Sequence, residues 1–366
     1  MRQLVKTGYR FPLLIGMMLS ACGGTLPPTS WPNASLGADT LMVSHGAAVY
    51  ALSPENGTFR WQFPRDGDRD ASKLYAAPAQ HGDLALLGSD NKHAFAVKIE
   101  TGQEVWRYPA TGKPTGKHGG TAPAAASGSA SLFFFTADDT LHALRPSDGV
   151  PAWTFQAEEE LWAAPAADHE RVYLPGMDHH LTALDIESGR KIWQRKLDGA
   201  LADTPTLSDG MLYLGALAKH AYAIDAVSGR VKWRFDSDGW VWSSPTVAGD
   251  RVYFADMDGN VYALDAETGR TYWQSPLLDS TIRGSPAFDN NTVFVATDGG
   301  FLYALDATTG NQIWWVQVDS NNADRLLADP IVRDGLVYVT AMNGENLVMA
   351  YHQKSGQLAW QFQPEG

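Results

Sequence analysis

Cysteine is almost absent from this chain of 366 residues, because Cys22 is the one cysteine in the sequence. A single thiol excludes an intramolecular disulfide and any metal or haem site built on a Cys-x-x-Cys motif. Side-chain packing, rather than covalent cross-links, must therefore stabilise the fold.

Long apolar runs are also scarce, and the clearest candidate lies at the N-terminus. Residues 11–19 are apolar, follow a basic segment, and lead into Leu19-Ser-Ala-Cys22. The run is too short for a mature membrane-spanning helix and is typical of a secretory signal whose last four residues match a bacterial lipobox. We therefore expect residues 1–21 to be a removed signal peptide, Cys22 to be lipidated, and residues 22–30 to tether the body to a membrane. The alternative is an ordinary signal that leaves Cys22 free.

A surplus of basic residues is missing too. The sequence has 28 Lys and Arg residues against 41 Asp and Glu residues, a net charge of −13. Removal of residues 1–21 takes away three basic residues, so 28 − 3 = 25 basic residues face 41 acidic ones, a balance of −16. Nucleic-acid phosphates would repel a chain this acidic, and we expect no nucleic-acid partner. Whether Cys22 is lipidated or left free, the secretory signal predicts that the chain lies outside the cytoplasm.

What the chain has in abundance is one hairpin pattern, which residues 261–273 show clearly. Residues 261–264 form an apolar run typical of a strand buried on both faces, and residues 271–273 begin a second strand. Between them, Asp265 is placed to bond backbone N–H groups two residues on, and Gly269 is placed where a turn requires positive φ. The stretch therefore predicts a β-hairpin.

This hairpin recurs eight times. Its glycine recurs as Gly57, Gly102, Gly149, Gly189, Gly229, Gly269, Gly310 and Gly356. An alanine stands six residues before each glycine, as Ala51, Ala96, Ala143, Ala183, Ala223, Ala263, Ala304 and Ala350. A tryptophan stands four residues after each glycine, as Trp61, Trp106, Trp153, Trp193, Trp233, Trp273, Trp314 and Trp360. The constant alanine indicates close packing, and we interpret the tryptophans as rings that fill the gaps between neighbouring repeats.

Each repeat is preceded by a further apolar strand and by a proline with small neighbours. These landmark prolines are Pro32, Pro78, Pro123, Pro165, Pro205, Pro245, Pro286 and Pro330. A unit of roughly 40 to 46 residues then holds four short antiparallel strands, the content of a propeller blade. Such repeats can also stack as an open solenoid, but small residues on the first strand favour radial closure around a channel. The sequence therefore predicts an all-β fold, an eight-bladed β-propeller of four-stranded antiparallel blades, as one domain over residues 31–366.

The motif Ala-Leu-Asp-x-x-Thr-Gly-x-x-x-Trp, at residues 263–273 and 304–314, resembles the tryptophan-docking repeat of quinoprotein (PQQ-like) eight-bladed propellers. Within that superfamily, the chain resembles the family of the outer-membrane assembly lipoprotein BamB. That resemblance implies a lipid anchor, blade-docking tryptophans, no quinone cofactor, and a place in the periplasm-facing outer membrane or on the cell surface. In that family the first strand of the mature chain completes the last blade, whereas residues 358–362 here give the last unit its own fourth strand.

One rim of a propeller carries the loops that lead into the first strand of each blade, together with the turns between second and third strands. The residue three positions before each landmark proline should stand on that rim, at the channel mouth. Large side chains occupy this position at Tyr75, Trp162, Trp242 and Arg283. We predict that these four form a binding surface, where rings stack a planar ligand or anchor a partner peptide and Arg283 meets a carboxylate. The alternative is that the rings merely plug the channel.

Motifs with metal-binding or catalytic character are weak. Residues 256–267 place acids and amides as in a calcium loop, but Val261 stands where glycine is required, so we interpret the segment as a hairpin turn. Five histidines fall in rim turns without the short spacing of a metal site: His45, His93, His179, His180 and His220. Residues 158–160 are three glutamates that we interpret as a solvated loop. We expect no metal and no catalytic residues.

The sequence therefore favours a non-catalytic, lipid-anchored scaffold that binds other envelope proteins outside the cytoplasm. The alternative is a sensor or quinoprotein-type oxidoreductase that binds PQQ or another planar small molecule at the channel mouth. Many enzymes that resemble this chain in fold hold their quinone with a vicinal cysteine pair, which a single cysteine cannot supply. Nucleophile, phosphate-loop and zinc-protease motifs are also missing from the sequence.

Overall fold

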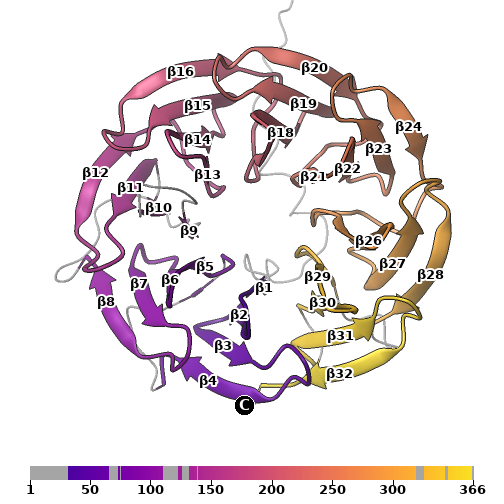
Figure 1. Cartoon of the computed structure of the whole chain (residues 1–366), viewed down its shortest axis with the longest axis horizontal. Coiled ribbons are helices and arrows are strands. Elements are labelled where there is room, and N and C mark those ends of the chain that lie inside the picture. The colour runs from indigo at the N-terminus through magenta and orange to yellow at the C-terminus, as the bar shows by residue number, and fades with distance from the viewer. Residues whose placement is uncertain are drawn as a thin grey trace, which may run out of the picture. The chain divides into compact units, whose positions relative to one another are not determined.

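The computed structural model describes residues 32–65, 73–74, 76–109, 123–125, 132–137, 139–318, 325–342 and 345–364. All of them belong to one of the two compact units of the chain, Trp31–Gly366. Within these residues, eight four-stranded antiparallel sheets form a ring around a common centre (Figure 1). The predicted all-β, eight-bladed propeller is confirmed.

Each blade consists of four consecutive strands. Blade one contains β1 (Asn33–Leu36), β2 (Leu41–His45), β3 (Ala48–Leu52) and β4 (Phe59–Phe63). Blade two contains β5 (Ala79–His81), β6 (Leu84–Gly88), β7 (Ala94–Lys98) and β8 (Glu104–Tyr108). Blade three contains β9 (Pro123–Ala125), β10 (Phe133–Ala137), β11 (Thr140–Leu144) and β12 (Pro151–Gln156). Blade four contains β13 (Ala166–Ala167), β14 (Arg171–Pro175), β15 (His180–Asp185) and β16 (Lys191–Lys196).

The second half of the ring repeats the same order. Blade five contains β17 (Thr206–Ser208), β18 (Met211–Ala216), β19 (His220–Asp225) and β20 (Val231–Asp236). Blade six contains β21 (Thr246–Ala248), β22 (Arg251–Ala255), β23 (Val261–Asp265) and β24 (Thr271–Gln274). Blade seven contains β25 (Ala287–Asp289), β26 (Thr292–Ala296), β27 (Phe301–Asp306) and β28 (Gln312–Gln317). Blade eight contains β29 (Ile331–Arg333), β30 (Leu336–Thr340), β31 (Val348–His352) and β32 (Leu358–Phe362).

The first strand of each blade lies nearest the centre of the ring, and the fourth strand forms its outer edge (Figure 1). First strands of neighbouring blades touch one another, for example β5 with β9 and β25 with β29. These innermost strands are only two to four residues long. Short strands fit there because eight blades converge on the centre.

The hairpin between the third and fourth strands has the same turn in blade after blade. In blade six, Gly269 N donates to Asp265 O (2.9 Å) and has a φ of +72°. The equivalent aspartate of blade seven, Asp306, accepts the predicted bond from the N–H two residues on, Thr308 N (3.0 Å), and a further bond from Thr309 N (2.8 Å). In blade six, Asp265 likewise accepts from Thr268 N (2.8 Å), three residues on. The five-residue turn explains this further bond, because its i to i+4 backbone bond brings the third N–H over the side chain. A β-bulge lies between Ala263 and Leu264, just before this turn, and every other blade has a bulge at the corresponding alanine.

Each hairpin tryptophan packs on the hairpin glycine of the next blade. The eight glycines have φ between +65° and +73°, and a Cβ atom on any of them would lie within 3 Å of the docked indole. Each indole N–H donates to a backbone carbonyl of that same turn, at 2.6 to 3.1 Å. The constant alanine lies directly opposite the tryptophan across the hairpin, as Ala263 does with Trp273. Glycine is therefore required twice at this position, for its φ and for the missing side chain.

The hydrophobic core lies between the blades rather than within them. Buried side chains form eight clusters, and each cluster joins two neighbouring blades. Between blades six and seven, for example, Tyr253 and Trp273 pack with Val293 and Tyr303. Each blade is stable only beside its neighbours, as expected for a repeat whose single unit cannot bury its own apolar faces.

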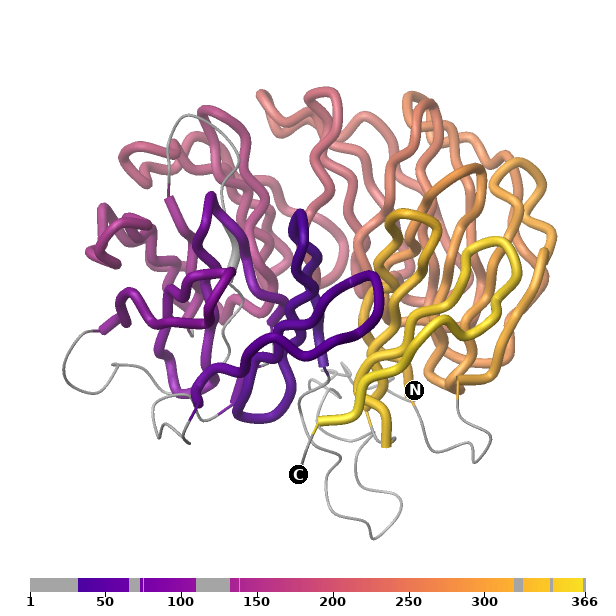
Figure 2. The backbone as a smooth tube through the Cα atoms, turned by 60° about the horizontal axis from the view of Figure 1, so that its bottom comes forward, coloured from indigo at the N-terminus to yellow at the C-terminus, as the bar shows by residue number. Residues whose placement is uncertain are grey.

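Ring closure between blades one and eight uses the same contacts as every other blade interface. The first strand β1 pairs with β2 in its own sheet, and blade eight has four strands of its own. Trp360 packs on Gly57 and donates to Pro54 O (3.1 Å), and Tyr338 Oη donates to the same carbonyl (3.1 Å). Figure 2 shows the first blade, in indigo, beside the last blade, in yellow. No strand exchange between the two blades is seen among the described residues, in contrast to the closure that the resemblance implies.

Several predictions concern residues outside the described part of the chain. These are the signal peptide at residues 1–21, lipidation of Cys22, the tether at residues 22–30, and Tyr75 on the rim. They stay predictions. A search of the described residues for a helix of the length and apolarity needed to cross a membrane finds none.

Candidate functional site

The candidate site lies on the loop rim, which we define as the loops before each first strand and the turns between second and third strands. Around the ring, backbone hydrogen bonds join these loops to these turns. Met257 N donates to Trp240 O (2.8 Å), and Asp298 N donates to Thr281 O (2.8 Å). Each of these bonds joins the loop and the turn of one blade. Neighbouring blades are linked by bonds such as that from Leu326 N, in the loop before β29, to Thr297 O in the turn of blade seven (3.4 Å).

Two tryptophans of the loop rim present exposed rings. Trp162, in the loop before β13, is 46% exposed, and its Nε1 donates to Glu160 Oε2 (3.0 Å). Trp240, in the loop before β21, is 45% exposed and was not singled out from the sequence. Rings this open contribute little to the core. They do supply rigid apolar surface of the kind that anchors protein interfaces.

Trp242 and Arg283 meet on the loop rim, from blades six and seven. The Arg283 guanidinium carbon lies 5.6 Å from the centre of the Trp242 ring, within the range of a cation–π contact. Arg283 Nε also lies 3.5 Å from Asp298 Oδ2. Asp298 in turn accepts two bonds from Arg325, from Nε and Nη2, both at 2.6 Å.

Asp298 is the shared partner of two arginines that come from different loops. Its carboxylate is mostly buried, whereas Arg283 and Arg325 remain about one-quarter to one-third exposed, at 27% and 35%. One carboxylate faces two guanidinium groups, and a second carboxylate, that of Asp329, accepts a bond from Ser285 N (2.6 Å) nearby. The Asp298 carboxylate raises the pKa of Arg325 further above its already high ordinary value. The pair of arginines is suited to bind a carboxylate or another planar anion.

Two aspartates stand directly before innermost strands, Asp203 in blade five and Asp329 in blade eight. Burial raises the pKa of the Asp203 carboxyl to about 7, and the negative charge of Asp329 adds to the rise. Bonds from Thr204 N (2.7 Å) and Ser244 N (2.8 Å) oppose the rise, because they favour the ionised form. Asp329 is exposed to solvent, and its carboxylate accepts a bond from Ser285 N (2.6 Å).

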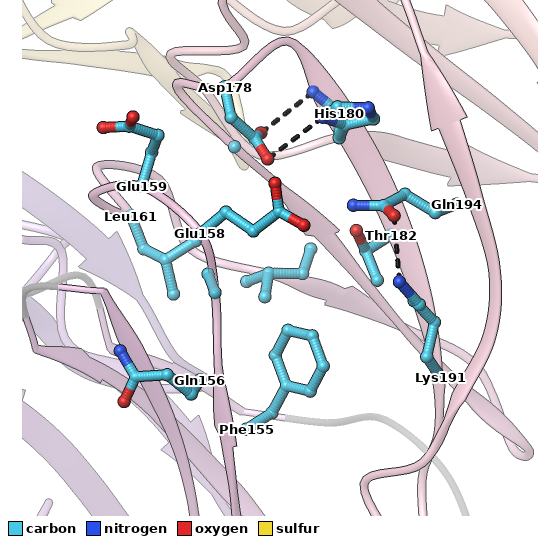
Figure 3. Close-up of a pocket in the computed structure, with 13 residues that line it drawn as sticks. Phe155, Gln156, Glu158, Glu159, Leu161, Asp178, His180, Thr182, Lys191 and Gln194 are labelled. Carbon is cyan, nitrogen blue, oxygen red and sulfur yellow. Dashed lines mark hydrogen bonds and ion pairs between the residues drawn. The ribbon is translucent and has the colours of Figure 1, made fainter.

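A cavity of about 140 Å³ opens on the loop rim between blades three and four (Figure 3). Phe155 and Leu161 form apolar walls, and Glu158 and Asp178 turn their carboxyl groups toward the space. His180 Nδ1 lies 3.0 Å from Asp178 Oδ2. Sequence patterns did not point to this cavity.

The weak metal motifs of the sequence are engaged in other contacts. Asp256 of the calcium-like segment is fully buried, and its oxygens accept bonds from Gly239 N (2.9 Å), Asn260 N (3.0 Å) and Tyr262 Oη (2.8 Å). His220 Nδ1 lies 2.9 Å from Asp236 Oδ1. Across the described residues, no three His, Cys, Asp or Glu side chains gather where they could hold a metal ion.

The repeated tryptophan–glycine contacts between blades and the ring of eight blades indicate a specific propeller family. The family model described as outer membrane protein assembly factor BamB matches four overlapping segments, residues 34–120, 115–205, 178–280 and 258–366. This chain belongs to the BamB family. The resemblance seen in the sequence is thereby confirmed, and it extends over the whole ring of this BamB-family chain.

Solved structures share the same ring. The crystal structure of BamB from Moraxella catarrhalis matches with a TM-score of 0.70 at 20% identity, covering 91% of this chain and 95% of that one. The computationally designed Ika8 protein matches with a TM-score of 0.73 at 16% identity, covering 89% of this chain and 97% of that one. At these identities the likeness shows the fold alone. A search of curated proteins finds no match to this BamB-family chain.

The structure brings together two of the four predicted rim residues, Trp242 and Arg283. Trp162 lies on the same rim but has its own partner in Glu160, and Tyr75 is outside the described residues. Sequence reasoning missed Arg325 because the loop before Pro330 is long, which puts the arginine five positions before the proline instead of three. The polar character of that loop was the available signal.

Proposed function

We propose that this chain is a non-catalytic docking scaffold of the cell envelope, held outside the cytoplasm by a lipid on Cys22. The loop rim would bind a partner protein through Trp162, Trp240 and Trp242 and through the arginine pair of Arg283 and Arg325. The observation that carries the proposal is the combination of exposed rings and a partly exposed arginine pair on one face of a BamB-family propeller.

The aromatic part of this surface suits a protein partner. Trp162 and Trp240 each expose nearly half of a large ring, and a backbone hydrogen bond from Met257 N to Trp240 O fixes the loop of Trp240 in place. Rigid tryptophans lose little conformational entropy when a partner covers them, so they are efficient anchors. The propeller places them in blades four and six, far enough apart to require an extended partner surface.

The charges of the rim supply orientation. The arginine pair belongs to blades seven and eight, and the glutamates of residues 158–160 belong to the loop before blade four, halfway around the ring. A partner with an acidic patch and a basic patch would fit in one orientation and be repelled in the other. Specificity of this kind needs no catalytic residues.

A planar cofactor on Trp242 is less well supported. The Arg283 guanidinium already covers one face of that ring, so less ring surface is left for a quinone to stack on. The exposed Trp162 ring lies on the loop before β13, whereas Trp240 and Trp242 lie on the loop before β21, so Trp162 comes from a different blade.

Lipid anchoring rests on the sequence at Cys22 and has a direct test. Mass spectrometry of protein purified from its native membrane should find residue 22 as the N-terminus with attached acyl chains. A Cys22→Ser variant should move from the membrane fraction to the soluble extracytoplasmic fraction. Cys22 found as a free thiol in membrane-extracted protein would refute the anchor.

Docking is tested by pull-down from the native membrane with the wild-type chain and with Trp162→Ala, Trp242→Ala and Arg325→Ala variants. We expect the rim variants to lose a stoichiometric partner that the wild type retains, while Trp162→Ala leaves the melting temperature unchanged because its ring is half exposed.

Trp315→Gln is the matched control. Trp315 is 52% exposed like the rim tryptophans but lies on the outer strand β28, away from the rim, and glutamine stands at the corresponding position of blades one, four, six and eight. This variant should retain the partner. Loss of stability without loss of partner in the rim variants would mean that the rings only plug the channel. A tight quinone-type ligand with no protein partner would overturn the scaffold.

A further inference from the structure

The cavity between blades three and four lies where other blades carry a large side chain. The relevant position is the third-strand residue just before the constant alanine. Around the ring it is occupied by Tyr50, Phe95, His142, Thr182, Tyr222, Tyr262, Tyr303 and Met349. Thr182 of blade four is much the smallest of the eight. The other blades therefore show which kind of side chain blade four lacks at this position.

In blades five and six this position holds a buried tyrosine that fills the space beside the preceding blade. Tyr222 and Tyr262 are 3% and 2% exposed. Their hydroxyl oxygens accept bonds from the backbone N–H groups of Asp198 (3.2 Å) and Asp238 (3.1 Å), in the loops that enter these blades. The Tyr262 ring also contacts Phe235 on the outer strand of blade five, with ring centres 5.3 Å apart. Each tyrosine thus joins the entering loop to the neighbouring blade.

Blade four keeps the surroundings of this ring but lacks the ring. Phe155 of blade three stands two residues after Trp153, as Phe235 of blade five stands two residues after Trp233. Glu158 and Asp238 each stand five residues after the same tryptophans. Phe155 and Glu158 line the cavity, together with Thr182 (Figure 3). Thr182 is too short to cross the space, which measures about 140 Å³. An engineered apolar cavity of about 150 Å³ admits benzene, so this cavity has room for one six-membered ring.

The charged side chains that line the cavity indicate which groups should flank a ring that binds there. Glu158, Glu159 and Asp178 contribute three carboxylates to its lining. Lys191 is the one lysine or arginine in that lining, and its Nζ donates to Gln194 Oε1 (2.9 Å). The excess of negative charge favours a ring that carries a basic group beside it.

We propose that this cavity binds the side chain of a tyrosine in a basic segment of a partner polypeptide. The phenol ring would occupy the space that Tyr222 and Tyr262 fill in their own blades, between Phe155 and Thr182. A lysine or arginine next to that tyrosine would meet Glu158 and Glu159. The choice of a polypeptide as the source of the ring rests on the proposed docking function, whereas the missing ring in blade four does not.

The test uses the full folded chain and three defined peptides, with binding followed by calorimetry and by NMR. The peptides are acetyl-Lys-Tyr-Lys-amide, acetyl-Lys-Ala-Lys-amide and acetyl-Glu-Tyr-Glu-amide. We expect the first to bind with a Kd of about 1 mM, typical of a ligand with one buried ring, and the other two to bind at least about tenfold more weakly. p-Cresol alone should also bind more weakly than the first peptide, because it lacks the basic groups.

Thr182→Tyr is the decisive variant, because it restores the ring that the other blades possess. It should abolish binding of acetyl-Lys-Tyr-Lys-amide and raise the melting temperature by about 2 °C or more, as cavity filling does. The reverse change, Tyr262→Thr, should open the equivalent space beside Phe235 and Asp238 in blade six and add a second, similar site.

Three outcomes would overturn the inference. Unchanged peptide binding by Thr182→Tyr would show that the peptide binds elsewhere. A lowered melting temperature for Thr182→Tyr would show that the space cannot hold a ring. Binding of p-cresol as tight as that of the peptide would assign the cavity to a small phenol instead. If Trp162→Ala loses the native partner while Thr182→Tyr retains it, the docking function stands and the cavity plays no part in it.

Discussion

Substitution of Gly57 by alanine tests whether tryptophan docking contributes to closure of the ring. Gly57 has a φ of +71°, and a Cβ atom there would lie 2.5 Å from Cε3 of Trp360, at the interface of blades one and eight. Gly46 of the same blade is the matched control, because it has a φ of +57° and no heavy atom within 4 Å of an added Cβ. Both changes place alanine in the left-handed region, and one of them also meets an indole.

The expected magnitudes follow from these two geometries. Alanine at positive φ costs about 1 kcal/mol relative to glycine, and this cost applies at both positions. Carbon atoms pack comfortably at about 3.5–4.0 Å, so the Gly57 variant must also shift the turn or the ring by about 1 Å. Overpacking of this kind costs about 1–3 kcal/mol more. We therefore expect Gly46→Ala to lower the free energy of unfolding by about 1 kcal/mol and Gly57→Ala to lower it by about 2–4 kcal/mol.

The assay is urea unfolding followed by tryptophan fluorescence, with the double variant Gly57→Ala, Trp360→Ala included. Removal of the indole removes the clash, so the double variant should be less destabilised than the sum of its parts by about 1–2 kcal/mol. Equal costs for Gly46→Ala and Gly57→Ala, or strict additivity in the double variant, would refute docking at this interface. Closure would then depend on contacts other than Trp360 and Gly57.

Two further predictions concern charge and surface. Because burial raises the pKa of Asp203 to about 7 in the folded state, that state holds more protons than the unfolded chain between about pH 4 and pH 7, and the free energy of unfolding should fall as pH rises through this window. Asp203→Asn, which cannot ionise, should flatten this slope in unfolding measured at several pH values; an unchanged slope would exclude Asp203 as its source. Trp315→Gln should change the free energy of unfolding by no more than about 0.5 kcal/mol, because half of that ring is exposed and other blades carry glutamine there. A loss of several kcal/mol would show that the outer edge of blade seven is part of the core.

The repeat made the fold readable from the sequence. Gly269, Ala263 and Trp273 each have one role that recurs in every blade, and eight copies of the same spacing leave little choice of architecture. The positive φ of the hairpin glycine and the burial of the third strand also follow from local rules. The detail that was missed is the additional bond from Thr268 N to Asp265, because a bond to the third N–H depends on the closed turn rather than on the side chain alone.

The candidate site was predictable only in part. Counting back from each landmark proline found Trp162, Trp242 and Arg283, since equivalent loops enter equivalent strands. The same count passed over Arg325 and Asp298, whose contact joins two loops of different length. It also passed over the cavity beside Thr182, because a small residue in a strand is unremarkable until its neighbours are known.

By itself, the sequence determined which contacts hold this protein together, because those contacts repeat and each lies within a short stretch of chain. Only the tertiary structure showed where differences between the repeats create candidate binding features. The shared Asp298 and the empty space beside Thr182 each depend on residues from two blades, which local patterns cannot place side by side. The physical reason is that a propeller buries its core between units, so its individual features also arise between units.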